Sequence, residues 1–256
     1  VFMADPHIIE ERREGVAVLR MQRPEKKNSL TAAMYNALRE GIERADQDPA
    51  IGAVVITGTD DCFTAGNDLH DFQAAATAET PMERSPALEM IEAMARSEVP
   101  VIAAVNGIAI GIGTTLLLHC DFVYAGTSAV FRTPFVDLGL CPEAASSLLL
   151  PLIIGPRRAS EMLLGGMPLD AEQARDCGLV NSVHADEQTL SAALAQAANL
   201  ARKPREAVRL SKRLMREHWQ ANILQTMAEE RREFGQRLQS DDCKAALAAF
   251  FGRTQK

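Results

Sequence analysis

Apolar and polar positions alternate with two different periods along the first third of the chain. Residues 8–11 and 16–21 carry the short apolar runs typical of strands, and a charged turn that ends at Gly15 separates them. Apolar residues then recur every four positions from Leu30 to Ile42, which is the spacing of one face of an amphipathic helix. The pattern therefore predicts a strand–strand–helix unit at the start of the chain.

Apolar runs of the length of a strand continue through the middle of the chain. After them, apolar residues recur mostly at the spacing of helices. The runs of strand length occur at residues 53–57, 101–105, 122–124, 130–132 and 180–183. From Ala144 onward the spacing is otherwise almost wholly helical and ends in a long stretch over 190–251. This order predicts an α/β core of similar strand–strand–helix turns over residues 1–195, followed by a helical region over residues 196–256.

Composition and charge narrow the classes of protein that the chain can be. Its 256 residues carry 27 Lys and Arg against 34 Asp and Glu, a formal net charge of −7, and 5% of them are aromatic. An acidic chain with few aromatic side chains is not expected to bind nucleic acid. No apolar run approaches the roughly 18 residues of a membrane-spanning helix, and no leader pattern opens the chain.

Cysteine and histidine usage favours a reducing compartment and gives no metal pattern. The five cysteines are widely spaced without a C-x-x-C pair, and the five histidines are isolated. This suits neither a disulfide framework nor a zinc site. We therefore expect a cytoplasmic protein with no metal ion and no membrane or nucleic-acid partner.

Two glycine-containing loops are the first candidates for chemistry, since the chain has neither a P-loop nor a nucleophile elbow. In the first, Gly107, Gly111 and Gly113 follow a predicted strand and precede a helical run. Their spacing is not that of a dinucleotide fingerprint, because Leu116 takes the place of its third glycine. The segment does offer free backbone N–H groups at a helix N-terminus, which can stabilise a developing negative charge.

The second loop covers residues 63–69. Its small residues let a ligand approach the backbone, and Asn67 tolerates unusual backbone angles. Taken alone, the loop is equally an ordinary strand-to-helix turn capped by Asp68. Together, the two loops can supply two N–H donors to one oxygen atom.

These loops and their neighbouring motifs resemble the crotonase (enoyl-CoA hydratase/isomerase) superfamily over about residues 8–250. The motifs are Phe63–Leu69, Ile102–Gly113, Cys120-Asp121, Arg23–Asn28 and Ala174–Val180. The resemblance implies a crotonase-like spiral of ββα turns and a helical C-terminal region that forms a homotrimer or a dimer of trimers. It also implies an acyl-CoA substrate and no cofactor beyond the coenzyme A that this substrate carries.

The same resemblance implies roles for particular residues. The backbone N–H groups of Asn67 and Ile112 would form an oxyanion hole. Contacts to the substrate or its coenzyme A are implied at Ala65, Gly66, Asn67, Asp68, Leu69, Lys26, Gly111 and Phe135. Hydratases of the superfamily carry one glutamate at the position of Thr115 and another at that of Phe135. Water addition needs both carboxylates, so efficient hydration is not expected here.

Glu143 is the candidate base. Taken alone, it is equally a first-turn acid that complements the dipole of the following helix. The surrounding pattern T-P-F-x-x-L-G-x-x-P-E-x-x-S-S, however, resembles Δ3,Δ2-enoyl-CoA isomerases of the peroxisomal type and their bacterial relatives, in which this glutamate is the only base. The resemblance thus implies an isomerase that moves a C3=C4 double bond to C2=C3 through a dienolate. An apolar pocket walled by Phe135 is expected to raise the pKa of Glu143.

Two alternatives stay open. The first alternative to an isomerase is an enoyl-CoA hydratase or another crotonase-type acyl-CoA enzyme. The second is a non-catalytic acyl-CoA-binding protein of the same fold. A non-catalytic binder has no need of an acid at position 143, which favours an enzyme.

A local excess of positive charge contrasts with the acidic average. The segment from Arg202 to Glu217 holds seven basic and two acidic residues, and Arg23, Lys26 and Lys27 form a second cluster. One interpretation is a solvated helix face. The other places these clusters, Lys26 and Lys212 in particular, near the phosphates of coenzyme A.

Overall fold

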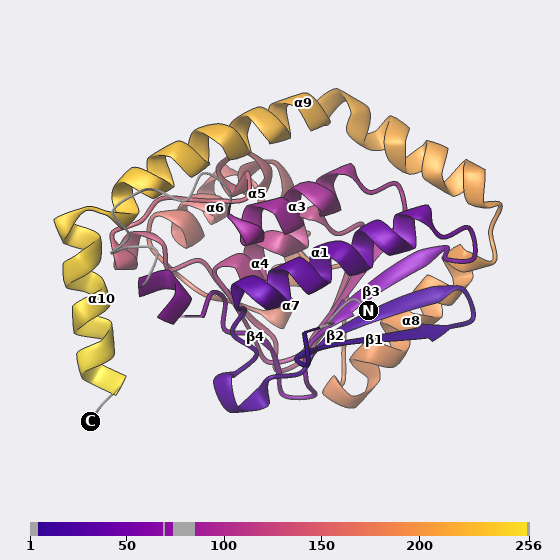
Figure 1. Ribbon diagram of the computed structural model, residues 1–256, viewed down its shortest axis with the longest axis horizontal. Coiled ribbons are helices and arrows are strands. Elements are labelled where there is room, and N and C mark those ends of the chain that lie inside the picture. The colour runs from indigo at the N-terminus through magenta and orange to yellow at the C-terminus, as the bar shows by residue number, and fades with distance from the viewer. Residues whose placement is uncertain (1–4, 69, 74–84, 255–256) are drawn as a thin grey trace.

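Two β-sheets form the centre of the molecule in a computed structural model that describes residues 5–68, 70–73 and 85–254 (Figure 1). The larger sheet has six strands in the order β1-β2-β3-β5-β7-β10, and the smaller has four in the order β4-β6-β8-β9. The strands are β1 (Ile8–Arg13), β2 (Val16–Met21), β3 (Ala53–Thr57), β4 (Cys62–Thr64), β5 (Val101–Val105), β6 (Ile108–Ile110), β7 (Phe122–Gly126), β8 (Val130–Arg132), β9 (Leu169–Asp170) and β10 (Ser182–His184). All neighbours pair in parallel except β1 with β2 and β8 with β9.

Helices connect the strands and make up most of the C-terminal part. They are α1 (Ala32–Gln47), α3 (Pro86–Arg96), α4 (Ile112–Thr115), α5 (Ser146–Ile154), α6 (Pro156–Leu163), α7 (Ala171–Asp176), α8 (Asp186–Ala201), α9 (Arg205–Leu238) and α10 (Asp241–Thr254). Short 3₁₀ turns are η1 (Pro24–Lys26), η2 (Leu116–His119) and η3 (Val136–Leu138). In the described part of the chain, no helix is long and apolar enough to cross a membrane.

The larger sheet is buried on both faces, which explains why its central strands are continuous apolar runs. Alternate residues of β3 point to opposite sides. Val54 and Ile56 belong to the main core beneath α1 and α3, whereas Ala53 and Val55 belong to a smaller cluster beneath α8. All five residues of β3, like those of β5, are buried. A run of this kind therefore predicts a strand but not which helix covers it.

The predicted fold class, an α/β core with a helical C-terminal region, is confirmed. The boundary expected after residue 195 falls inside α8, whose Ala193 and Ala197 pack on the larger sheet. The helices that leave the sheet are α9 and α10, and Figure 1 shows α9 arching over the molecule with α10 descending at its far end. The helix expected after Gly111 is a single turn, α4, followed by η2.

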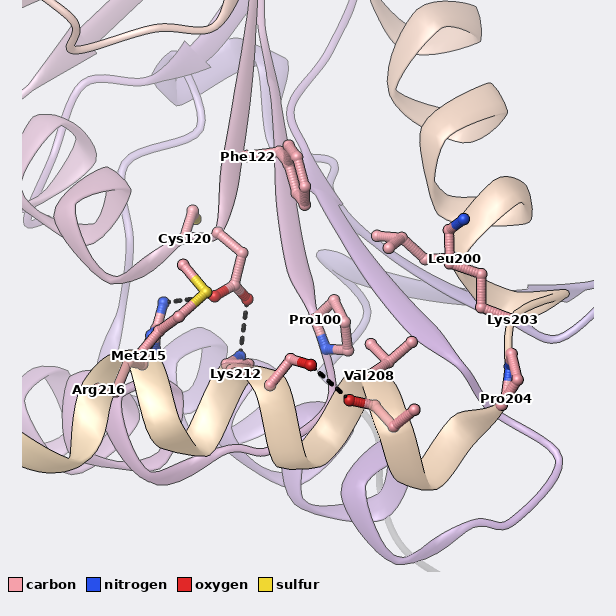
Figure 2. A pocket seen from close by; sticks show the side chains of 13 residues that line it. Pro100, Cys120, Phe122, Leu200, Lys203, Pro204, Val208, Lys212, Met215 and Arg216 are labelled. Atoms are coloured by element: carbon pink, nitrogen blue, oxygen red, sulfur yellow. Dashed lines mark hydrogen bonds and ion pairs between the residues drawn. The ribbon is translucent and has the colours of Figure 1, made fainter.

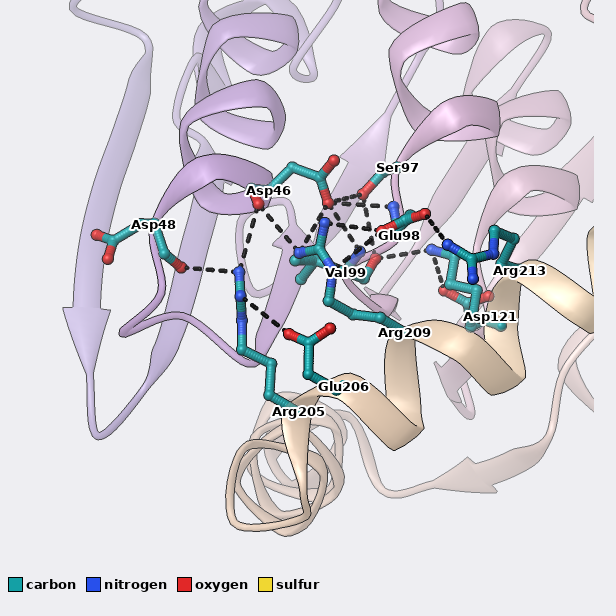
Figure 3. A network of polar contacts seen from close by, with 11 residues as sticks. Asp46, Asp48, Ser97, Glu98, Val99, Asp121, Arg205, Glu206, Arg209 and Arg213 are labelled. Carbon is teal, nitrogen blue, oxygen red and sulfur yellow. Dashed lines mark hydrogen bonds and ion pairs between the residues drawn. The ribbon is translucent and has the colours of Figure 1, made fainter.

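A polar network fastens the first half of α9 to the core (Figure 3). The Arg209 side chain donates to the backbone oxygen of Asp46 at 3.0 Å and to the Glu98 carboxylate at 3.1 Å. Arg205 donates to the backbone oxygen of Asp48 at 3.3 Å. The partners of these arginines lie at the end of α1 and in the turn before β5, which ties α9 to two elements distant in sequence.

Asp121 is the most enclosed acid of this attachment. Its carboxylate lies 2.7 Å from the Lys212 ammonium and 2.8 Å from the Arg216 guanidinium, and it also accepts from the Val101 N–H at 2.8 Å. The Lys212 side chain is 6% exposed and donates to the Val99 oxygen as well. Burial lowers the pKa of Lys212 to about 8 despite the neighbouring Asp121. Two cations of α9 therefore depend on one carboxylate.

We expect Asp121→Asn to destabilise the protein by about 3 kcal/mol, because it leaves the buried Lys212 ammonium without its anionic partner. For a chain of this size, that corresponds to a loss of roughly 6–12 °C in melting temperature. Asp176→Asn is the matched control, since Asp176 pairs with Arg175 at a side-chain exposure of 70%. The control should stay within about 0.5 kcal/mol of the wild type in urea unfolding. Equal effects of the two substitutions would contradict this account of the attachment.

Candidate active site

Glu143 lies on the turn between η3 and α5 and lines a cavity of about 180 Å³. The cavity is built from the start of α1, the loop after β4, the start of α3 and the end of α9. Among the described residues, it is lined by Leu30, Ala32, Tyr35, Asn67, Asp68, Asp71, Phe72, Ser85, Pro86, Ala87, Leu88, Glu143, Arg231, Phe234, Gly235, Leu238 and Gln239. Most of these side chains are apolar or aromatic, which suits a chamber for an acyl chain, and three acids, Asp68, Asp71 and Glu143, lie in its wall.

The Glu143 carboxyl is 7% exposed and has one hydrogen-bond donor, the Thr115 hydroxyl, at 3.0 Å from its Oε1. Burial raises the pKa of Glu143 to about 8, since the charged form loses its hydration. The Thr115 hydrogen bond acts in the opposite direction, and the nearby Glu230 carboxyl raises the pKa further. A carboxyl that exchanges its proton near neutral pH is suited to general acid–base catalysis.

The two glycine-containing loops lie side by side, because β4 and β6 pair in parallel just before them. Gly66 has a φ of +93°, and a Cβ there would lie 2.7 Å from the Ile110 oxygen. A Cβ on Gly113 would lie 2.6 Å from the Thr64 side chain. Both positions therefore require glycine for the loops to approach each other.

Among the described residues of these loops, the N–H groups without a hydrogen-bond partner include those of Asn67 and Ile112. A parallel bridge to Leu30 uses the Gly66 oxygen and the Asp68 N–H, so the N–H of Asn67 points away from it. Ile112 is the first residue of α4, whose preceding Gly111 donates to the Arg132 oxygen. Within the described residues, neither Asn67 N–H nor Ile112 N–H donates to a backbone oxygen or a side chain.

Polar contacts hold the loop after β4 in place. The Tyr35 hydroxyl donates to the Asn67 side-chain oxygen at 2.7 Å. The Asp68 carboxylate pairs with Arg23 at 2.6 Å, and both side chains are largely buried. Asp68 therefore ties the loop to the segment after β2.

The predicted site residues fall into two groups. Glu143, Asn67 and Asp68 line the cavity together. Ala65, Gly66, Gly111 and Ile112 sit in the adjoining loops, Phe135 is buried at the start of η3, and Lys26 is exposed on η1. None of these six is among the residues that line the cavity in the described part of the chain. Leu69 lies outside the described residues.

Sequence reasoning missed the contribution of α9 to the cavity. Phe234 and Leu238 come from α9, and the Phe234 ring packs edge-on against Phe72 at 6.1 Å between centroids. Tyr35 was also missed, although it follows Met34 on the predicted apolar face of α1. A helix rich in charged residues gives little signal that two of its apolar side chains wall a site far away in sequence.

A larger cavity, of about 510 Å³, lies between the end of α8 and the start of α9, away from Glu143 (Figure 2). Lys212 and Arg216 reach its wall, but both are paired with Asp121. The expectation that Lys212 contacts coenzyme A phosphates therefore stays a prediction that its surroundings do not favour, because its ammonium is buried and paired within the protein. Several basic residues of the 202–216 stretch are likewise engaged with core acids and carbonyl oxygens, whereas Lys26 remains available at the surface.

Comparison with known proteins finds close likeness over nearly the whole chain. A family model described as enoyl-CoA hydratase/isomerase matches residues 11–256. Human enoyl-CoA delta isomerase 2 is 34% identical over 95% of the chain, which spans 62% of that protein's length. Crotonyl-CoA hydratase of Syntrophomonas wolfei is 35% identical over 97% of the chain and 96% of its own length. The solved structure of Pseudomonas aeruginosa OdaA superposes with a TM-score of 0.92 at 42% identity, covering 96% of this chain and 99% of that one.

We expect Glu143→Gln to be more stable than the wild type at alkaline pH. Both forms are uncharged at position 143 below pH 4.5, the ordinary value of a glutamate. Between pH 4.5 and about 8, the unfolded wild type releases a proton that the folded protein retains, so wild-type stability falls as the pH rises. Above pH 8 the free energy of unfolding of the variant, measured in urea, should therefore exceed that of the wild type by a few kcal/mol. This difference should shrink toward pH 5. A difference that is constant with pH would contradict the raised pKa.

Proposed function

The chain belongs to the enoyl-CoA hydratase/isomerase family, and within it we propose a Δ3,Δ2-enoyl-CoA isomerase that uses Glu143 as its only base. The observation that supports this is Glu143, a buried carboxyl in the cavity wall whose pKa lies near 8 and which, unlike the buried Asp68 beside it, has no cationic partner among the described residues. The acyl chamber around it is largely apolar. Such a site favours moving a proton along a carbon chain over adding water to it.

The proposed reaction moves one proton between two carbons of the acyl group. The Glu143 carboxylate takes a proton from C2 of a 3-enoyl thioester, the C2–H electron pair forms the C1=C2 bond of a dienolate that keeps its C3=C4 bond, and the C1=O π pair moves to the oxygen. The negative charge develops on the thioester oxygen. The protonated Glu143 then delivers a proton to C4, which leaves the C2=C3 double bond and regenerates the carboxylate.

The unpartnered N–H groups of Asn67 and Ile112 are the proposed donors to the thioester oxygen. Backbone donors fixed in tight loops need no reorganisation when the charge develops, and each such donor contributes about 3 kcal/mol in comparable sites. The backbone supplies them, so an isoleucine at position 112 serves as well as any other residue. The exposed Lys26 is the proposed contact for a coenzyme A phosphate.

Hydration is the rival activity, since some relatives are named hydratases and others isomerases. Water addition needs a second acid or base beside the first. Of the other two acids that line the cavity among the described residues, Asp68 is paired with Arg23 and Asp71 accepts from the Ala32 N–H. Thr115 and Phe135 do not exchange protons. The supporting contacts therefore favour a one-base reaction.

We also propose that the protein assembles as a homotrimer or a dimer of trimers through its C-terminal helices. The first half of α9 presents exposed apolar side chains, with Leu214 at 55%, Met215 at 78% and Trp219 at 46%. Apolar groups gathered on one helix are typical of a surface that is covered in an assembly.

Separate assays with a 3-enoyl-CoA and a 2-enoyl-CoA test the activity. We expect conversion of the first to the 2-enoyl product and little 3-hydroxyacyl product from either. Glu143→Gln should lower kcat for isomerisation by roughly 10²–10⁴-fold, because the neutral amide cannot take the C2 proton. The pH profile of kcat/KM should rise toward alkaline pH with a midpoint near the pKa of about 8, since the ionised form is active.

Three results would contradict the proposal. Undiminished isomerisation by Glu143→Gln would remove Glu143 from its role. Rapid hydration of the 2-enoyl-CoA would favour the hydratase. Tight binding of acyl-CoA with no turnover of either substrate would favour a non-catalytic binding protein.

Thr115→Val removes the one hydrogen bond that stabilises the charged Glu143 while keeping the shape of the side chain. The pKa of Glu143 should rise, so the midpoint of the kcat/KM profile should move to higher pH and activity at pH 7 should fall. Thr114→Ser, which keeps the neighbouring hydroxyl, should leave the midpoint in place. A midpoint unchanged in Thr115→Val would show that Thr115 does not stabilise the carboxylate.

A further inference from the structure

Glu230 is a buried acid in the last third of α9, 8% exposed, with no cationic partner among the described residues. It does not line the cavity of Glu143 within the part of the chain that the structure describes. A buried carboxylate without a cation is costly unless hydrogen-bond donors satisfy it. Its partners therefore indicate what keeps it in this position.

Those partners are backbone N–H groups at the start of α5. One Glu230 oxygen accepts from Ala145 N at 2.6 Å, and the other accepts from Ser147 N at 2.9 Å. The N-cap of α5 is Ala145, which has no side chain that can cap the helix. Glu230 thus satisfies, from another helix, the Ser147 N–H that a capping Asp or Ser would normally satisfy and the Ala145 N–H that the third residue of a capping box would satisfy.

The capped segment is the turn that carries Glu143. Ala144 and Ala145 both adopt the left-handed conformation, with φ of +59° and +57°. For a residue with a Cβ, each such position costs about 1 kcal/mol. On the other side of the turn, His119 Nε2 lies 2.8 Å from the Ala144 oxygen and donates to it. Two buried side chains therefore clamp a strained turn directly after Glu143.

We propose that Glu230 is a positioning residue for Glu143, which fixes the turn after the base through α5 and sets the electrostatic environment of its carboxyl. This inference rests on the proposed role of Glu143 as the base. Glu230 is not among the described residues that line the cavity. Its effect on the reaction passes through the place and the proton affinity of Glu143.

The groups around the two acids support an electrostatic effect. Burial lowers the pKa of His119 to about 4, so it faces the turn from η2 as a neutral ring. Burial likewise raises the pKa of Cys141, on the same loop, to about 11 and raises that of Tyr35, on α1, so both are neutral. Further along α9, Glu233 and Arg237 lie near Cys141 with opposite charges. Asp68 and Asp71 line the same cavity, with Asp68 paired to Arg23. Burial raises the pKa of Glu230 as well, against its N–H donors, and in its ionised form Glu230 raises the pKa of Glu143.

Glu230→Gln tests the inference, with Glu229→Gln as the matched control on the exposed neighbouring position. Carbon-13 NMR of protein labelled at the glutamate carboxyl carbons follows the titration of Glu143, whose signal is identified by its loss in Glu143→Gln. We expect Glu230→Gln to lower the pKa of Glu143 by about half a unit or more, since the like charge is gone. We expect Glu229→Gln to leave it unchanged.

Kinetics supply the second readout. Glu230→Gln keeps one hydrogen-bond acceptor and loses the other, so the turn loosens and kcat for isomerisation should fall by roughly tenfold with little change in KM. The midpoint of the pH profile should move to lower pH together with the titration. Glu230→Asp keeps the charge on a shorter side chain, so it should lower kcat while leaving the pKa of Glu143 raised.

Unchanged titration and unchanged kcat in folded Glu230→Gln would overturn the inference. A fall in thermal stability alone, with the pH midpoint in place, would overturn it equally, because that outcome marks a purely structural cap. The NMR titration needs no substrate, so it separates this inference from the proposed function. A shift in the pKa of Glu143 in a protein without isomerase activity would uphold the coupling and reject the isomerase.

Discussion

The attachment of α9 to the core is the constraint on which the candidate active site depends. Arg209 and Lys212 hold the start of this helix to Glu98 and Asp121. Its later turns supply Phe234 and Leu238 to the cavity wall and Glu230 to the turn behind the base. If α9 detached, water would reach Glu143, and the pKa of that carboxyl would fall toward 4.5. The same helix thus shields the Glu143 carboxyl from solvent and helps to keep its pKa raised.

Much of the core could be predicted from the sequence because buried parallel strands are continuous apolar runs, as at β3 and β5. Glu143 and the loop that contains Asn67 were predicted as site residues from their sequence motifs and the family resemblance. In the structure, Glu143 and Asn67 line one cavity. The pairing of the basic stretch with core acids was not predicted, because Asp121 and Glu98 lie about a hundred residues away from the cations that they neutralise. Pairing across such a distance leaves no local pattern.

The conformation of the turn after Glu143 could not be predicted from the sequence either. Alanine favours helices, so two consecutive alanines in the left-handed region contradict local propensity. Tertiary contacts from His119 and Glu230 override it. Conflicts between local preference and the observed backbone concentrate at functional sites, where surrounding contacts hold a geometry that the chain would not adopt alone. The strain at Ala144 and Ala145 is therefore independent support for a functional role of Glu143.

The arrangement of the two buried acids bears on the choice between one-base and two-base chemistry. Glu143 lines the cavity, and the Thr115 hydroxyl donates a hydrogen bond to its carboxyl. Glu230 instead faces the backbone of α5, and each of its two oxygens accepts a hydrogen bond from a backbone N–H group. A carboxylate committed in this way cannot deliver a proton to substrate, but its charge still acts on its neighbour across the low-dielectric interior. Of the two acids, only Glu143 lines the cavity among the described residues, and its pKa is raised. Water addition needs a second acid or base in the cavity, and Glu230, which does not line the cavity among the described residues, cannot be that group.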